Sequence, residues 1–165
     1  MDIYREQIVP KSPTKMDTLK KICVGFIAIM LAAVLFLLSG FFNLTFIGLI
    51  FAGVFIYFGF YLISSFDTEY EYIVTNGEID IDKIIAKRKR KRLITVKVSA
   101  FVKFGLLKDA PLSQDVTLVI ASGKISNDDY YAEFNHSAHG QVRLIFSPDE
   151  RTLEAIKPYI PRTIR

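Results

Sequence analysis

The feature that most constrains this chain is a run of 45 residues, Ile22–Phe66, that contains no Asp, Glu, Lys, Arg or His. A helix needs about 20 apolar residues to cross a hydrocarbon core about 30 Å thick, so the run is too long for one span and suits two. The segment 39–43 interrupts it with a Gly and an Asn, which tolerate the backbone conformations of a tight turn. The sequence therefore predicts a transmembrane helical hairpin over 19–66, with spans at about 22–38 and 44–63.

Two other interpretations of the apolar run are disfavoured. A helical hairpin in the core of a soluble protein needs a polar stripe, and neither segment has one. A cleaved signal peptide has a shorter apolar region, and the residues ahead of this run are too many and too mixed in charge. No charged side chain lies inside either span, which argues against a pump or a transporter, and two helices enclose no pore.

Small residues recur at helical spacing in both spans. Faces of this kind let two helices approach closely in lipid. They either pack against each other within the hairpin or bind a partner membrane protein. The helix-packing candidates are Gly25, Ala28, Ala32, Gly48, Ala52 and Gly59.

Basic residues flank the hairpin and are absent from its turn. Cytoplasmic segments of membrane proteins carry an excess of Lys and Arg, so both termini are expected in the cytoplasm and the turn outside. The predicted location is the cell membrane, with a multi-pass topology. The basic residues concerned are Arg5, Lys11, Lys15, Lys20 and Lys21 before the first span, and Lys83 with the run 87–92 after the second. Cys23 is the single cysteine, which excludes an intrachain disulfide.

Residues 67–165 carry strand patterns, whereas residues 1–18 have two prolines and no apolar periodicity and are predicted to be an irregular tail. Asn76-Gly77 lies between two β-prone segments and is a strong hairpin signal. Alternating residues from Ile79 to Asp82 predict one buried and one wet face, and a third strand at 93–99 completes a meander.

Three more strands are predicted, at 115–121, 130–135 and 141–147, with 100–114 as a loop or a single helical turn. The first of the three places Val116, Leu118 and Ile120 in phase for burial. Ser147, Pro148 and Glu150 form a capping box with Pro at the first helical position. A C-terminal helix of about ten residues should follow.

Several segments resemble the bacterial PH-like domains that follow a pair of transmembrane helices, an uncharacterised family. They are Tyr72-Ile-Val-Thr75, Ile79-Asp-Ile81, Arg92-Leu-Ile-Thr-Val96 and Phe146-Ser-Pro-Asp-Glu150. The resemblance implies an α+β membrane protein, with an N-terminal transmembrane helical hairpin and a PH-like β-barrel or roll with one C-terminal helix over 67–165. That fold has seven strands, and six are predicted here. The family brings no assigned activity.

The run Lys87–Arg92 is the most unusual feature of the soluble part. Six adjacent positive charges repel one another and favour an exposed hairpin tip. The tip is either only solvated or contacts anionic headgroups of the inner leaflet, at roughly 1 kcal/mol per basic residue near the surface. Nucleic-acid binding is disfavoured because no aromatic residues interleave with the run. The lipid-contact candidates are Lys87, Arg88, Lys89, Arg90, Lys91 and Arg92.

No catalytic motif is present in the sequence. It lacks a nucleophile elbow, a Gly-rich phosphate loop and a His-Glu-x-x-His motif. Asp80 and Asp82 are expected on the wet face of a strand, and His136 and His139 in a polar turn rather than a metal site. We therefore expect no enzyme, no cofactor and no metal. The predicted function is a membrane-anchored binding or scaffold module that contacts anionic lipid or a membrane or cytoplasmic protein. The alternative is a structural subunit that assembles with a membrane complex through its helices.

Overall fold

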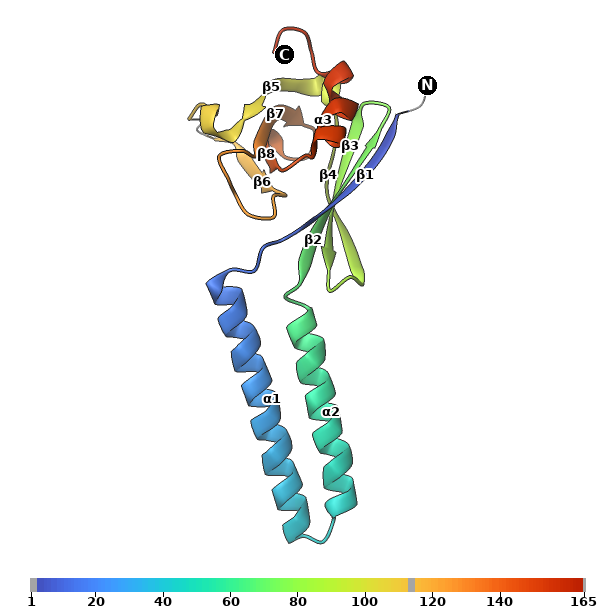
Figure 1. Cartoon of the computed structure of the whole chain (residues 1–165), viewed down its shortest axis with the longest axis vertical. Coiled ribbons are helices and arrows are strands. Elements are labelled where there is room, and N and C mark those ends of the chain that lie inside the picture. Colours follow the sequence, from blue (N-terminus) through green and yellow to red (C-terminus); the bar gives the residue numbers. More distant parts are fainter. Residues whose placement is uncertain (1–2, 113–114, 165) are drawn as a thin grey trace. The chain divides into compact units, whose positions relative to one another are not determined.

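The computed structural model describes residues 3–112 and 115–164 (Figure 1). The chain forms two compact units, which are described separately below. One unit combines the residues up to Ser12 with those from Thr68 onward, and the other is 13–67. The helical unit is therefore an insertion within the sequence of the β-rich unit. The prediction of an irregular tail is wrong for Tyr4–Pro10, which forms strand β1.

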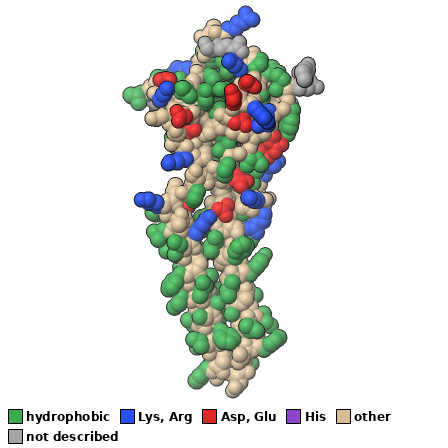
Figure 2. Space-filling view, viewed as in Figure 1, with side chains coloured by type: hydrophobic (Ala, Val, Ile, Leu, Met, Phe, Trp, Pro, Cys, Tyr) green, Lys and Arg blue, Asp and Glu red, His purple; other side chains and the backbone are tan. Residues whose placement is uncertain are grey.

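The helical unit consists of α1 (Lys15–Phe41) and α2 (Thr45–Ser64), which pack along each other as a hairpin. Thr14 caps α1 by accepting a hydrogen bond of 3.2 Å from the backbone N–H of Asp17. Asn43 adopts a positive φ of 55° in the predicted turn. Both helices are long and apolar enough to cross a membrane, and apolar side chains cover their exposed surface (Figure 2).

The first sheet is antiparallel, in the order β1-β2-β3-β4. Its strands after β1 are β2 (Thr68–Thr75), β3 (Glu78–Ile85) and β4 (Lys89–Lys97). Positive φ angles at Asn76 (48°) and Gly77 (83°) fit a type I′ turn, so the predicted hairpin is confirmed. β4 carries a bulge opposite Ile81 and Asp82, which matters for the basic run described below.

The second sheet has the order β5-β7-β8-β6, with β6 parallel to β8. Its strands, with two short 3-10 segments, are η1 (Val98–Ala100), β5 (Phe101–Leu106), η2 (Leu107–Asp109), β6 (Thr117–Ile120), β7 (Tyr130–His136) and β8 (Gly140–Phe146). The loop or helical turn predicted for 100–114 is wrong where β5 forms, and its last two residues lie outside the described part. The described residues thus form eight strands rather than the six predicted, and their two sheets do not close into a barrel.

The core lies between the inner faces of the two sheets. The predicted inward residues of β8 are confirmed, since Val142, Leu144 and Phe146 are fully buried. The phase predicted for β6 is wrong: Leu118 and Ile120 are exposed, and Val119 packs against the core. The parallel pairing with β8 sets that phase, and it leaves β6 at the edge of the sheet.

A C-terminal helix of about the predicted length is present, but its start differs and its last turn is 3-10 helix. It comprises α3 (Glu150–Ile156) followed by η3 (Lys157–Tyr159). The N-cap is Asp149, which accepts a 2.7 Å hydrogen bond from the N–H of Thr152. Ser147 is not the cap, because its hydroxyl donates to Asp129 Oδ1 at 2.6 Å.

β1 is fixed to the rest of its unit by polar side chains on its inner face. Arg5 pairs with Asp149 at 2.8 Å. Gln7 donates to the carbonyl of Ser147 at 3.0 Å and accepts from the N–H of Asp149 at 2.9 Å. The first strand is therefore an integral part of the β-rich unit.

Candidate lipid-contact site

The basic run is divided between a turn and a strand. Ala86 and Lys87 adopt positive φ angles of 55° and 54° in the β3–β4 turn, and β4 begins at Lys89. The prediction of an exposed hairpin tip is therefore wrong for Lys89–Arg92, which belong to a paired strand. All six side chains of the run are nevertheless exposed at the surface.

The β3–β4 turn lies at the end of the sheet where the chain passes into the helical unit. Ile85, just before the turn, pairs with Thr68, the first residue of β2. The last residue of β1, Pro10, pairs with Glu69. Only 65–67 separate α2 from β2, and three residues reach at most about 11 Å. The β3–β4 turn therefore lies at the same end of the sheet as the two connections to the helical unit.

One face of β4 carries arginines that are held by carboxylates. Arg90 Nη2 lies 2.8 Å from Glu71 Oε1, and Arg92 Nη1 lies 2.7 Å from Asp80 Oδ1. Arg92 also donates to Asp82, which is only 3% exposed. The expectation that both aspartates point to a wet face is thus wrong for Asp82. These two arginines hold the strands of the sheet together, and each is already neutralised by a neighbour.

On this face, burial disfavours the charged form of Glu71, whereas hydrogen bonding favours the charged form of Arg92. Burial raises the pKa of Glu71, and the attraction of Arg90 only partly offsets it. The pKa of Arg92 is raised mainly by its hydrogen bond to Asp82. Arg92 therefore stays charged and bound to Asp82. Glu71 is the side chain whose charged form its surroundings disfavour.

The other face of β4 carries lysines. Side chains alternate along a strand, so Lys89 and Lys91 point away from the arginine face. Lys91 is directly opposite Lys83 on β3. Like charges directly opposite each other destabilise a sheet unless an anion neutralises them. Within the described ranges, no carboxylate lies within ion-pair distance of Lys83, Lys89 or Lys91, which we call the lysine face. Sequence reasoning did not include Lys83 as a lipid contact, although the alternation of Lys and Arg in the run could have suggested the two faces.

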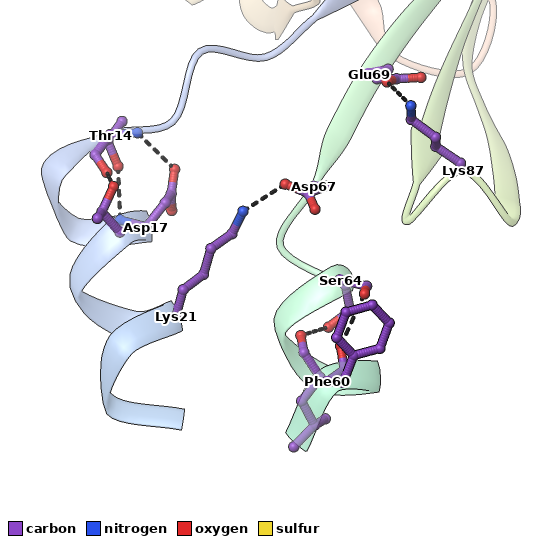
Figure 3. Close-up of polar contacts among 11 residues, drawn as sticks. Thr14, Asp17, Lys21, Phe60, Ser64, Asp67, Glu69 and Lys87 are labelled. Carbon is purple, nitrogen blue, oxygen red and sulfur yellow. Dashed lines mark hydrogen bonds and ion pairs between the residues drawn. The ribbon is translucent and has the colours of Figure 1, made fainter. Parts of the chain in front are cut away.

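Lys87 in the turn and Lys21 in the helical unit make exposed ion pairs (Figure 3). Lys87 Nζ is 3.8 Å from Glu69 Oε1, a loose contact for a side chain that is mostly exposed. Lys21 Nζ is 2.6 Å from Asp67 Oδ1 and so links the first turns of α1 to the residues that follow α2. Exposed pairs of this kind contribute little to stability, and a competing anion can displace them.

The small residues predicted for helix packing lie at the contact between α1 and α2. A Cβ added at Gly59 would lie 2.5 Å from Ala28 Cβ, and one at Gly48 would lie 2.4 Å from Ser39 Cβ. At Gly25 the nearest atom is Ile63 Cδ1, at 3.5 Å. Ala32 is buried and Ala52 half-buried in the same hairpin. These positions allow the two helices to approach closely.

The two histidines lie at the β7–β8 turn. The rings of His136 and His139 stack with centroids 5.0 Å apart, and the N–H of Ala138 donates to His136 Nδ1. Over the described ranges, no group of three or more His, Cys, Asp or Glu side chains is arranged to hold a metal ion. The arrangement is that of a polar turn.

The chain is similar to a family of known proteins over its whole length. The family model of the bacterial PH-like domain (DUF6106) matches residues 1–165. No curated protein and no solved structure matches the chain.

Proposed function

Because the chain belongs to the family of bacterial PH-like domain proteins, we propose that it is a membrane-anchored, non-catalytic binding module. In this proposal α1 and α2 cross the membrane, and the β3–β4 hairpin contacts anionic lipid headgroups. The observation that carries it is the lysine face: three lysines without carboxylate partners among the described residues, at the end of the sheet from which the chain enters the helical unit.

The pairing of β1 with β2 supports two membrane crossings. These strands flank the helical unit in the sequence and pair over seven residues, from Tyr4↔Thr75 to Pro10↔Glu69. Strands of one sheet must lie on the same side of a membrane, so the segment between them crosses an even number of times. The basic residues that flank the helices favour the cytoplasmic side. The cell membrane, with both termini in the cytoplasm, is therefore the proposed location.

The two faces of β4 support separate roles for the lysines and the arginines of the basic run. An arginine that is already paired with a buried carboxylate gains little from a lipid phosphate. A lysine without a partner gains roughly 1 kcal/mol near an anionic surface. Lys83, Lys89 and Lys91 are thus the proposed lipid contacts, while Arg90 and Arg92 stabilise the hairpin.

The test uses a single tryptophan in the full chain, which has none of its own. Ile85→Trp places the probe opposite Lys89, and the protein is reconstituted in lipid nanodiscs of phosphatidylcholine with or without phosphatidylglycerol. Quenching by headgroup-labelled lipid should be strong only with phosphatidylglycerol and should fall as salt is added. Lys89→Gln with Lys91→Gln should remove most of this quenching.

The matched control is Lys97→Gln with Lys108→Gln, which removes the same charge elsewhere on the unit. Lys97 lies at the opposite end of β4, opposite Glu78. This variant should keep the quenching of the unmodified chain. Quenching that ignores lipid charge, or that falls equally in both variants, would contradict lipid contact through the lysine face. The function would then be to bind a protein partner, or to assemble with a membrane complex through the two helices.

A further inference from the structure

Glu71 lies at the centre of the arginine face and is more deeply buried than any other carboxylate of that face. The residue is 2% exposed. Its Oε1 accepts a hydrogen bond of 2.8 Å from Arg90 Nη2. Its Oε2 is buried and has no hydrogen-bond partner among the described residues. A buried carboxylate oxygen without a donor is costly while the group is ionised and less so once it carries a proton.

Charged and titratable groups face Glu71 from the other three strands of its sheet. They are Tyr4 and Glu6 on β1, Asp82 on β3 and Arg90 on β4. Asp82 is directly opposite Glu71 in the sheet. Arg92 on β4 is already bound to Asp82. Glu71 therefore has two negative neighbours and one positive neighbour, and that positive neighbour is a well-exposed guanidinium which can turn outward.

We infer that protonation of Glu71 controls the charge that the β3–β4 hairpin presents to anionic lipid. When ionised, Glu71 keeps the Arg90 guanidinium in their ion pair on the arginine face. When protonated on the buried Oε2, it releases Arg90 and leaves the hairpin one unit more positive. The inference rests on the proposed function, because it regulates the same lipid contact. The proton comes from the aqueous phase, and no other reactant is needed.

The physical consequence is a lipid contact that strengthens as pH falls through the raised pKa of Glu71. One additional cation near an anionic surface corresponds to an increase in affinity of about fivefold. The direction agrees with the raised pKa of Glu71, for which burial is the main cause. The folded unit also gains stability as pH falls through this folded-state pKa and loses it as pH rises, because the folded state binds the proton more tightly than the unfolded chain.

Glu71→Gln tests the inference in the full chain carrying the Ile85→Trp probe. Phosphatidylglycerol is the anionic lipid, because its phosphodiester stays ionised over the range used. The apparent affinity for phosphatidylglycerol should rise about fivefold with falling pH in the parent protein. In Glu71→Gln it should be high and nearly independent of pH, since the side chain carries no charge at either end of the range.

Glu69→Gln is the matched control, on the same strand and the same face, two residues before Glu71. It also removes one negative charge, but from a more exposed site. It should raise the affinity at every pH and keep the pH dependence. A parent protein that binds without pH dependence, or a Glu71→Gln variant that titrates like the parent, would overturn the inference and leave the lipid contact intact. Absence of phosphatidylglycerol binding in all variants would instead refute the proposed function.

Discussion

At the scale of single residues, Asp149 serves two elements at once. Its carboxylate caps α3 through the N–H of Thr152 and pairs with Arg5 of β1. Burial opposes ionisation of Asp149, but the hydrogen bonds from Thr152 and Arg5 outweigh it and lower the pKa of this carboxyl. Ser147, which the sequence suggested as the cap, joins β8 to Asp129 instead. The capping motif in the sequence therefore predicts the start of the helix to within a few residues. Tertiary contacts decide which side-chain oxygen accepts the capping hydrogen bond.

We predict that Asp149→Ala lowers the free energy of unfolding by about 1–2 kcal/mol through loss of the cap. Asp149→Asn should lower the free energy of unfolding by less, because Asn is also a good cap. It should also abolish the part of the pH dependence of stability that comes from the Asp149 carboxyl. A lowered folded pKa gives stability that is present above the unfolded pKa and is lost as pH falls through the folded pKa. Thermal melts of the full chain in neutral detergent, at neutral and acidic pH, measure both effects. Melting of Asp149→Ala at the parent temperature would contradict the assignment of this cap.

At the scale of elements, the sequence predicts the strands whose apolar residues alternate and misses those whose residues do not. The hairpin at Asn76-Gly77 and the inward residues of β8 follow directly from the pattern. β1 is missed because its inward positions include the polar Arg5 and Gln7, whose partners lie 140 or more residues away. β5 contains Gly105 and is short, so its pattern is too brief to distinguish from a loop.

The division of the basic run was only partly predictable, for a related reason. Its alternation of Lys and Arg is visible in the sequence, but the face on which each residue lies depends on the bulge opposite Ile81 and Asp82. That bulge puts Arg92 and Ile94 on opposite faces, although they are two residues apart. The buried carboxylate Glu71 could not be identified as a partner of Arg90 without the register of three strands.

The role of β1 gives a prediction about which fragments fold. Residues 68–165 alone lack the edge strand and the contacts of Gln7 with Ser147 and Asp149, so this fragment should melt at a lower temperature or not fold. A chain in which a short Asn-Gly turn replaces 13–67 should be soluble and melt cooperatively. The turn is feasible because the N–H of Lys11 already donates to the carbonyl of Thr68 at 2.9 Å. Calorimetry compares the two, and equal melting temperatures would contradict an integral β1.

At the scale of the whole molecule, the account depends on one topological relation. A segment with two apolar helices is inserted between two strands that pair with each other. If the helices cross the membrane, both connections must emerge on one side, and the β-rich unit must assemble there from two separate parts of the chain. The basic residues on both flanks favour the cytoplasm for that side. The proposed lipid contact and its proton control both require this arrangement.

The most direct test is the labelling of single cysteines in intact cells, with Cys23→Ser removing the native thiol. Phe42→Cys lies in the turn between α1 and α2, and Asp128→Cys lies on the surface of the β-rich unit. We predict that an impermeant thiol reagent added outside labels Phe42→Cys at once and labels Asp128→Cys only after the membrane is permeabilised. Labelling of Asp128→Cys in intact cells, or protection of both cysteines, would contradict the membrane-spanning hairpin with a cytoplasmic PH-like unit.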